Sequence, residues 1–155
     1  MGRDWDARLR RMYPDGRAGA AARRFARFWA AVFRLGLQPR RWVTLEVPGR
    51  SSGLPRRFPL GMADLDGRWY LVSMLGECHW VANVRAAGGE AALLRGRRRP
   101  VRLVEVPPAE RARVVSCYLE QVPGGRPHIR ARLAEPGATL ESVATALPVF
   151  RVEPR

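Results

Sequence analysis

The 155-residue chain contains no lysine, so all 28 of its basic residues are arginines. This absence excludes a phosphate-binding P-loop, because that motif needs a lysine to reach the phosphates. The motif Gly-x-Gly-x-x-Gly is missing as well, which excludes the usual dinucleotide-binding fold. A redox cofactor would therefore have to bind in some other way.

Cysteine and histidine are scarce. The two cysteines, Cys78 and Cys117, are too few for a disulfide framework and do not have a paired metal-ligand spacing. The two histidines, His79 and His128, do not fall into a zinc-protease or deaminase pattern. We therefore expect an intracellular, reduced protein without a metal site.

Long apolar runs are also missing. No stretch reaches the roughly 18 apolar residues of a membrane-spanning helix. The N-terminal region has no apolar run of signal-peptide quality. We expect a cytoplasmic protein, with contact to the inner face of the cell membrane as an alternative for its location.

What the chain has in excess is positive charge. Hydrophobic residues make up 46% and charged residues 27%, which is ordinary for one globular domain. The formal net charge of +14 favours a polyanionic partner, such as a nucleic acid, an anionic membrane or a small polyanion. The run Arg95-Gly96-Arg97-Arg98-Arg99 is interpreted as a solvated hairpin tip, because no nucleic-acid recognition module accompanies it. We expect no nucleic-acid partner.

Residues 18–36 have the pattern of an amphipathic helix. Apolar residues recur at three- and four-residue steps, and arginines border them, in the set Phe25, Phe28, Trp29, Val32, Phe33 and Leu35. Such a helix either packs on the core of its own domain or lies on an anionic lipid surface. We predict two parts, residues 1–36 as a tail with this helix and residues 37–155 as a cofactor-binding domain.

From residue 41 the sequence consists of short apolar runs separated by turn residues. Strands are predicted at 42–47, 56–63, 69–74, 90–94, 100–106 and 149–152, with an Asp66-Gly67 hairpin turn. Helices are predicted at 79–87 and 107–121, and Thr139 caps another that runs to residue 147. Six strands with peripheral helices predict a mainly β, α+β fold, a small six-stranded antiparallel barrel.

Two segments carry candidate functional residues. The loop Gly49–Arg56 combines two glycines, two serines and two arginines, which suits a phosphate cradle; a structural turn with surface arginines is the alternative. The second segment runs from Ser73 into the 79–87 helix, where Trp80 and Asn83 share one face. One interpretation of this face is a flat stacking surface beside an amide. The alternative is that the tryptophan belongs to the core and the asparagine caps a helix.

Together these segments resemble the deazaflavin-dependent nitroreductase and quinone reductase family. The likeness runs from about Gly36 to the C-terminus and rests on four motifs in order: Gly49 to Arg56 with Pro59-Leu60, Ser73-x-x-Gly76, Trp80-x-x-Asn83-x-Arg85-Ala86, and Pro148-Val149-Phe150-Arg151. The resemblance implies a split β-barrel and an oxidoreductase. It would transfer hydride from reduced coenzyme F-420, with FMN as the alternative cofactor, to a quinone, nitroaromatic or other electron-poor acceptor.

The resemblance also implies site residues. The phosphate and acidic tail of the cofactor would be held by Arg50, Ser52, Gly53 and Arg56. The deazaflavin ring would be flanked by Pro59, Leu60, Ser73, Met74, Leu75 and Gly76, and the groove closed by Trp80, Asn83 and Arg85. Ser73 would be the catalytic residue, as a hydrogen-bond donor to the substrate. The alternative is a non-catalytic split barrel that binds a flavin, haem or lipid. Both a monomer and a dimer stay open.

Overall fold

The computed structural model describes residues 24, 27 and 41–155. The predicted tail and amphipathic helix, and with them the membrane contact through residues 18–36, lie outside this part except for Arg24 and Arg27. The boundary between residues 36 and 37 therefore stays a prediction. Among the described residues, no helix has both the length and the apolar character to cross a membrane.

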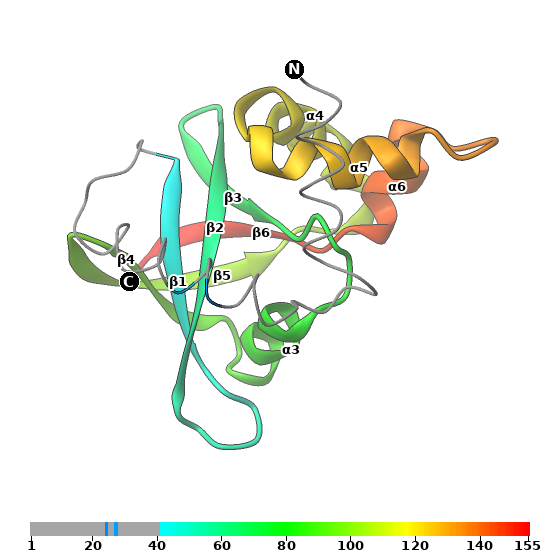
Figure 1. Cartoon of the computed structure of the whole chain (residues 1–155). Coiled ribbons are helices and arrows are strands. Elements are labelled where there is room, and N and C mark those ends of the chain that lie inside the picture. The colour runs from blue at the N-terminus through cyan, green and yellow to red at the C-terminus, as the bar shows by residue number, and fades with distance from the viewer. Residues whose placement is uncertain (1–23, 25–26, 28–40) are drawn as a thin grey trace.

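Six antiparallel strands close into a barrel in the order β1-β2-β3-β6-β5-β4 (Figure 1). The strands are β1 (Trp42–Pro48), β2 (Pro55–Leu65), β3 (Arg68–Val72), β4 (Glu90–Arg95), β5 (Arg97–Glu105) and β6 (Val149–Pro154). Every predicted strand is present, so the predicted six-stranded antiparallel barrel is confirmed. The Asp66-Gly67 turn is confirmed too, with φ of 53° and 74° at its two residues, as a tight hairpin turn of this kind requires.

One strand starts earlier than predicted. The arginines expected at a hairpin tip belong to β5, because Arg97, Arg98 and Arg99 pair with Arg95, Leu94 and Leu93 of β4. The tip is therefore centred on Gly96, whose φ is +71°. Backbone pairing does not depend on the side chains. All three arginines are exposed, and Arg98 pairs with Glu46 at 2.9 Å.

The barrel interior forms one hydrophobic core. Alternate residues of β1 point inward, and Val43, Leu45 and Val47 are all buried in the same cluster. Helix α3 (His79–Ala86) adds Trp80, Val81 and Val84 to this cluster. The helix lies beside the barrel, below the other helices in Figure 1. The position of α3 is thus fixed by the apolar residues that it inserts into the barrel core.

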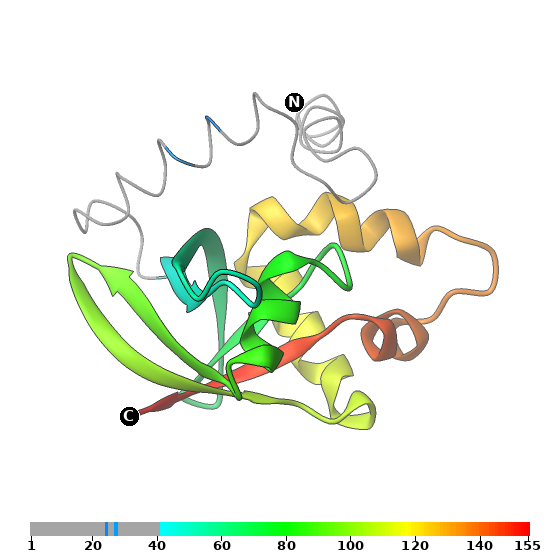
Figure 2. The ribbon, with the colours of Figure 1, turned by 90° about the horizontal axis from the view of Figure 1, so that it is seen from below.

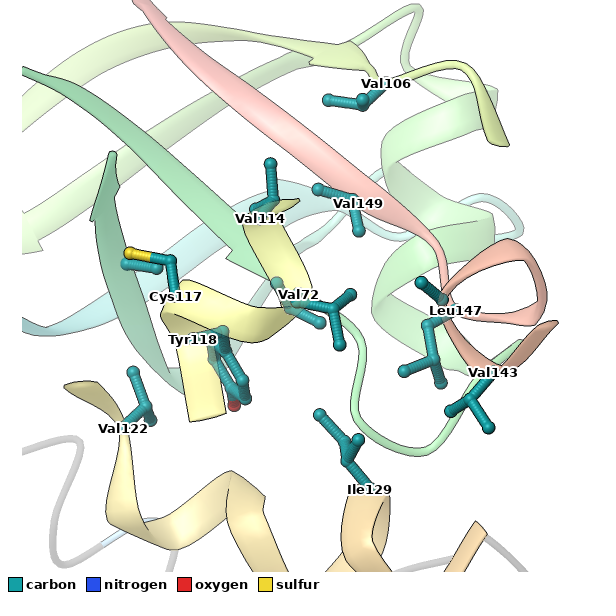
Figure 3. Packing of buried hydrophobic residues seen from close by; sticks show 13 residues of the cluster. Val72, Val106, Val114, Cys117, Tyr118, Val122, Ile129, Val143, Leu147 and Val149 are labelled. Carbon is teal, nitrogen blue, oxygen red and sulfur yellow. The ribbon is translucent and has the colours of Figure 1, made fainter. Parts of the chain in front are cut away.

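A second core lies between the barrel and the remaining helices, as Figure 3 shows. These are α4 (Arg111–Gln121), α5 (Arg126–Leu133) and α6 (Leu140–Ala146), with short 3-10 turns η2 (Pro108–Glu110) and η3 (Pro123–Gly125). Figure 2 shows the helical layer on one side of the barrel. Thr139 caps α6 as predicted, since its side chain accepts a hydrogen bond from the Ser142 amide at 3.1 Å.

Helix α5 was not predicted from the sequence. Only two of its eight residues, Pro127 and Ile129, are buried, so it lacks a clear apolar period. Pro127 at the first turn suits a helix start, and the fully buried Ile129 anchors the helix in the second core. Tertiary packing therefore stabilises a helix that local pattern alone does not indicate.

Candidate functional site

The loop between β1 and β2 is a compact turn that points its polar side chains outward. The Gly49 amide donates to the Leu54 carbonyl at 2.8 Å, and the Gly53 amide donates to the Gly49 carbonyl at 2.8 Å. Gly53 has φ +69°, a conformation that glycine adopts without strain. The Ser52 hydroxyl accepts from the Leu54 amide at 3.2 Å. Internal hydrogen bonds therefore shape the loop and leave its side chains exposed.

The loop is tied to α3 through one residue. Asn83 Oδ1 accepts a hydrogen bond from the Arg50 amide at 3.2 Å and another from the Arg50 guanidinium at 3.0 Å. His79 Nδ1 lies 3.4 Å from the same guanidinium. Residues predicted to bind the cofactor at two distant positions in the sequence are thus brought into direct contact.

Within the described part of the chain, no acidic side chain pairs with the arginines of the loop. Across the described residues, the ion pairs include neither Arg50 nor Arg56, and both residues are exposed. The next arginine along β2, Arg57, pairs instead with Glu46 at 2.9 Å. Guanidinium groups that lack a described carboxylate partner, on a loop shaped by internal hydrogen bonds, fit the phosphate and carboxylates of an anionic cofactor.

The turn after β3 carries the predicted catalytic residue. Ser73 is 2% exposed, and its hydroxyl donates to the Gly76 carbonyl at 2.5 Å. The Ser73 oxygen also lies 3.3 Å from the Cys78 sulfur. The hydroxyl proton is therefore already donated to the Gly76 carbonyl within the turn. Donation to a substrate would require the O–H bond to rotate away from Gly76.

Sequence reasoning missed Arg132, which contacts the same turn. Its guanidinium donates to the Leu75 carbonyl at 3.3 Å. Gly76 has φ +79°, and a β-carbon at this position would lie 3.1 Å from a guanidinium nitrogen of Arg132. Because glycine has no β-carbon, there is room for this contact. No sequence signal pointed to Arg132, since the contact depends on α5.

The structure places Trp80 and Arg85 differently from the groove-closing positions that the resemblance implies. Trp80 is 6% exposed and packs on Phe150, with ring centroids 5.5 Å apart, so the alternative of a core tryptophan holds. Arg85 pairs with Glu77 and with Glu105, each at 2.7 Å. These bonds raise the pKa of Arg85, and its hydrogen bond lowers the pKa of Glu105. The Arg85 guanidinium is already engaged by two carboxylates.

The residues predicted to flank the ring belong to different layers. Leu60 packs against the barrel core, whereas Met74 packs against the outer core. Pro59 lies within β2, opposite Thr44 of β1. Leu75 and Gly76 complete the turn that Arg132 contacts. The structure thus brings Ser73, Leu75 and Gly76 into one turn. The assignment of all these residues to the cofactor stays a prediction.

The arginine run at the β4–β5 tip lies away from the loop. Because β4 is antiparallel to β1 and Leu94 pairs with Thr44, the tip lies near the start of β1. The loop follows the end of β1, about 20 Å away for a strand that rises about 3.3 Å per residue. Charge at the tip cannot contact an anion bound to the loop.

Comparisons with known proteins place the closed barrel among the split-barrel reductases. A sequence model of the F420H(2)-dependent quinone reductase family matches residues 22–128. The chain belongs to this family, as the sequence resemblance predicted. It is thus an oxidoreductase whose cofactor is coenzyme F-420.

Solved structures agree on the fold. A structure described as a domain-swapped dimer has a TM-score of 0.55 and 19% identity, over 86% of this chain and 96% of the other. An F420-H2 dependent reductase, FDR-A, has a TM-score of 0.53 and 22% identity, over 74% and 95%. A proposed 5-nitroimidazole antibiotic resistance protein from Bacteroides thetaiotaomicron has a TM-score of 0.52 and 8% identity, over 74% and 72%. No curated protein matches the chain.

Proposed function

We propose that the protein transfers hydride from reduced coenzyme F-420 to a quinone, with the β1–β2 loop holding the anionic part of the cofactor. The observation that carries this assignment is the exposed pair Arg50 and Arg56, which have no carboxylate partner among the described residues. A phosphate or glutamate would complete their hydrogen bonding. Family membership supports the same assignment.

Coenzyme F-420 supplies the hydride when it is bound, and the protein supplies binding, orientation and electrostatics. Arg50, Ser52 and Arg56 bind the phosphate and acidic tail, and Gly53 gives the loop its shape. The turn from Ser73 to Gly76 borders the ring, and Arg132 holds that turn through the Leu75 carbonyl. Ser73 donates to the acceptor after its hydroxyl leaves Gly76.

The acceptor is a planar, electron-poor molecule. The family indicates a quinone as the acceptor. Nitroaromatics are proposed as further acceptors because they too are electron-poor. Peripheral contact with an anionic membrane through residues 18–36 is kept as a proposal that rests on the sequence pattern. The alternative of a non-catalytic flavin-, haem- or lipid-binding barrel is not pursued, since the family is one of reductases.

The first test compares two arginines at opposite ends of β1. We expect Arg56→Ala to weaken binding of coenzyme F-420 by about 1–3 kcal/mol, the range for losing a hydrogen bond to a charged group. Arg97→Ala removes the same charge at the β4–β5 tip and should leave the affinity nearly unchanged. Fluorescence titration of both variants measures the two dissociation constants. Equal losses would mean that diffuse positive charge, rather than the loop, attracts the cofactor.

A further inference from the structure

Asn83 is the only asparagine of the chain, and it is 4% exposed. Its side-chain oxygen accepts two hydrogen bonds, and both come from Arg50, one from the backbone amide and one from the guanidinium. An amide oxygen has two lone pairs, so this acceptor is fully used. A direct contact of Oδ1 with the cofactor would break one of these bonds.

The two bonds fix different parts of Arg50. The bond to the amide, at 3.2 Å, holds the loop backbone where the chain leaves β1, and the bond to the guanidinium, at 3.0 Å, sets the side-chain orientation. His79 lies one helical turn before Asn83, on the same face of α3, and its Nδ1 is 3.4 Å from the second guanidinium nitrogen. The α3 face therefore holds one side of the guanidinium and leaves the remaining N–H donors for another acceptor.

An arginine fixed in this way binds an anion at lower entropic cost. A free arginine side chain populates many rotamers, and part of this entropy is lost when the side chain is ordered on a ligand. Asn83 orders Arg50 before the ligand arrives. The buried helix thus preorganises an exposed loop.

We propose that Asn83 is a positioning residue, whose side-chain oxygen orients Arg50 for the phosphate of coenzyme F-420. This role rests on the proposed function. It differs from the direct contact that the sequence resemblance implies. Asn83 then affects cofactor affinity only through Arg50.

A double-mutant cycle tests the dependence on Arg50. We expect Arg50→Ala to weaken coenzyme F-420 binding roughly 10- to 100-fold and Asn83→Ala to weaken it by a smaller factor. The double variant should bind only slightly more weakly than Arg50→Ala alone, because the backbone amide at position 50 is then the one bond to Asn83 that is left to lose. Losses that multiply in the double variant would show that Asn83 acts independently and would overturn the positioning role.

Asn83→Asp separates orientation from charge. The carboxylate keeps an acceptor for both Arg50 donors, so amide hydrogen exchange at Arg50 should stay slow, whereas Asn83→Ala should accelerate it. The new ion pair offsets the positive charge of Arg50, so cofactor binding should weaken although the loop stays ordered. Fast exchange at Arg50 in wild-type protein would contradict the contact.

Gln121→Ala is the matched control. Gln121 Oε1 also accepts from a backbone amide, that of Asp64 at 2.8 Å, and from an arginine, Arg41 at 3.0 Å, but at the far end of β1. We expect this variant to lose stability and keep both its cofactor affinity and slow exchange at Arg50. If Gln121→Ala lost as much cofactor affinity as Asn83→Ala, the effect of Asn83 would be explained by general stability and the positioning role would be overturned. If wild-type protein binds no coenzyme F-420, the proposed function fails, and the exchange measurement still decides whether Asn83 holds Arg50.

Discussion

Gly61 of β2 lies directly against Val122, the residue that follows α4. A β-carbon at this position would overlap the Cγ1 atom of Val122, which is itself 2% exposed and cannot move into solvent. We expect Gly61→Ala to lower the free energy of unfolding by about 1–3 kcal/mol, the usual cost of overpacking a filled core. Urea denaturation measures the change.

Val122→Ala supplies the control for Gly61. The smaller side chain makes room for the new methyl group, so the double variant should be more stable than the sum of the two single losses predicts. Additive losses would contradict steric overlap as the cause. The glycine itself is visible in the sequence, but its neighbour Val122 is not, because they are far apart along the chain.

Glu46 pairs with two arginines of the barrel. Its carboxylate lies 2.9 Å from Arg57 on the neighbouring strand β2 and 2.9 Å from Arg98 on β5, beyond β4. Partial burial would raise the pKa of Glu46, but the hydrogen bonds from Arg98 and Arg57 outweigh it and lower the pKa below the ordinary value of 4.5. A lowered pKa in the folded state means stability that is present above pH 4.5 and is lost as the pH falls through the folded-state pKa.

Glu46→Gln should therefore reduce stability by about 1 kcal/mol at pH 7. The difference from wild type should shrink as the pH falls from 4.5 through the folded-state pKa, where Glu46 becomes neutral in both states. Asp66→Asn is the control, because the pair of Asp66 with Arg113 is exposed at 73% and 77% and should contribute little. A stability difference that stays constant from pH 7 to below that pKa would contradict the charge-based explanation.

At the scale of elements, the strands were predictable and one helix was not. Strand β1 alternates apolar and polar residue types from Val43 to Val47, and turn residues such as Asp66-Gly67 mark the ends of hairpins, so local pattern suffices. Helix α5 has three arginines among its eight residues and depends on Ile129 packing into the outer core. That contact joins elements distant in sequence, and no local pattern indicates it.

The candidate site shows the same division. The loop Gly49–Arg56 could be proposed from its residue types, since glycine, serine and arginine together suit an anion. The partners Asn83 and Arg50 were both named, but their mutual hydrogen bonds arise from the packing of α3 against β1. Arg132 could not be found in the sequence because its helix was not predicted. Residue types predict chemistry, whereas which residues touch is decided by tertiary structure.

At the scale of the whole molecule, the excess charge has two separate roles. A net charge of +14 attracts any polyanion at long range, and this attraction weakens as salt screens it. The loop adds Arg50 and Arg56, which have no described carboxylate partner, and α3 holds Arg50 in place. We propose that general charge increases the rate of encounter and that the loop determines which anion is retained.

The most direct test is a fluorescence titration of the purified full-length protein with coenzyme F-420 and, separately, with FMN. The account predicts saturable binding of coenzyme F-420 that persists at physiological salt, where attraction by net charge alone is screened within about 8 Å. FMN should bind much more weakly. Tight binding of FMN with no binding of the deazaflavin would contradict the assignment of the cofactor and of the reaction.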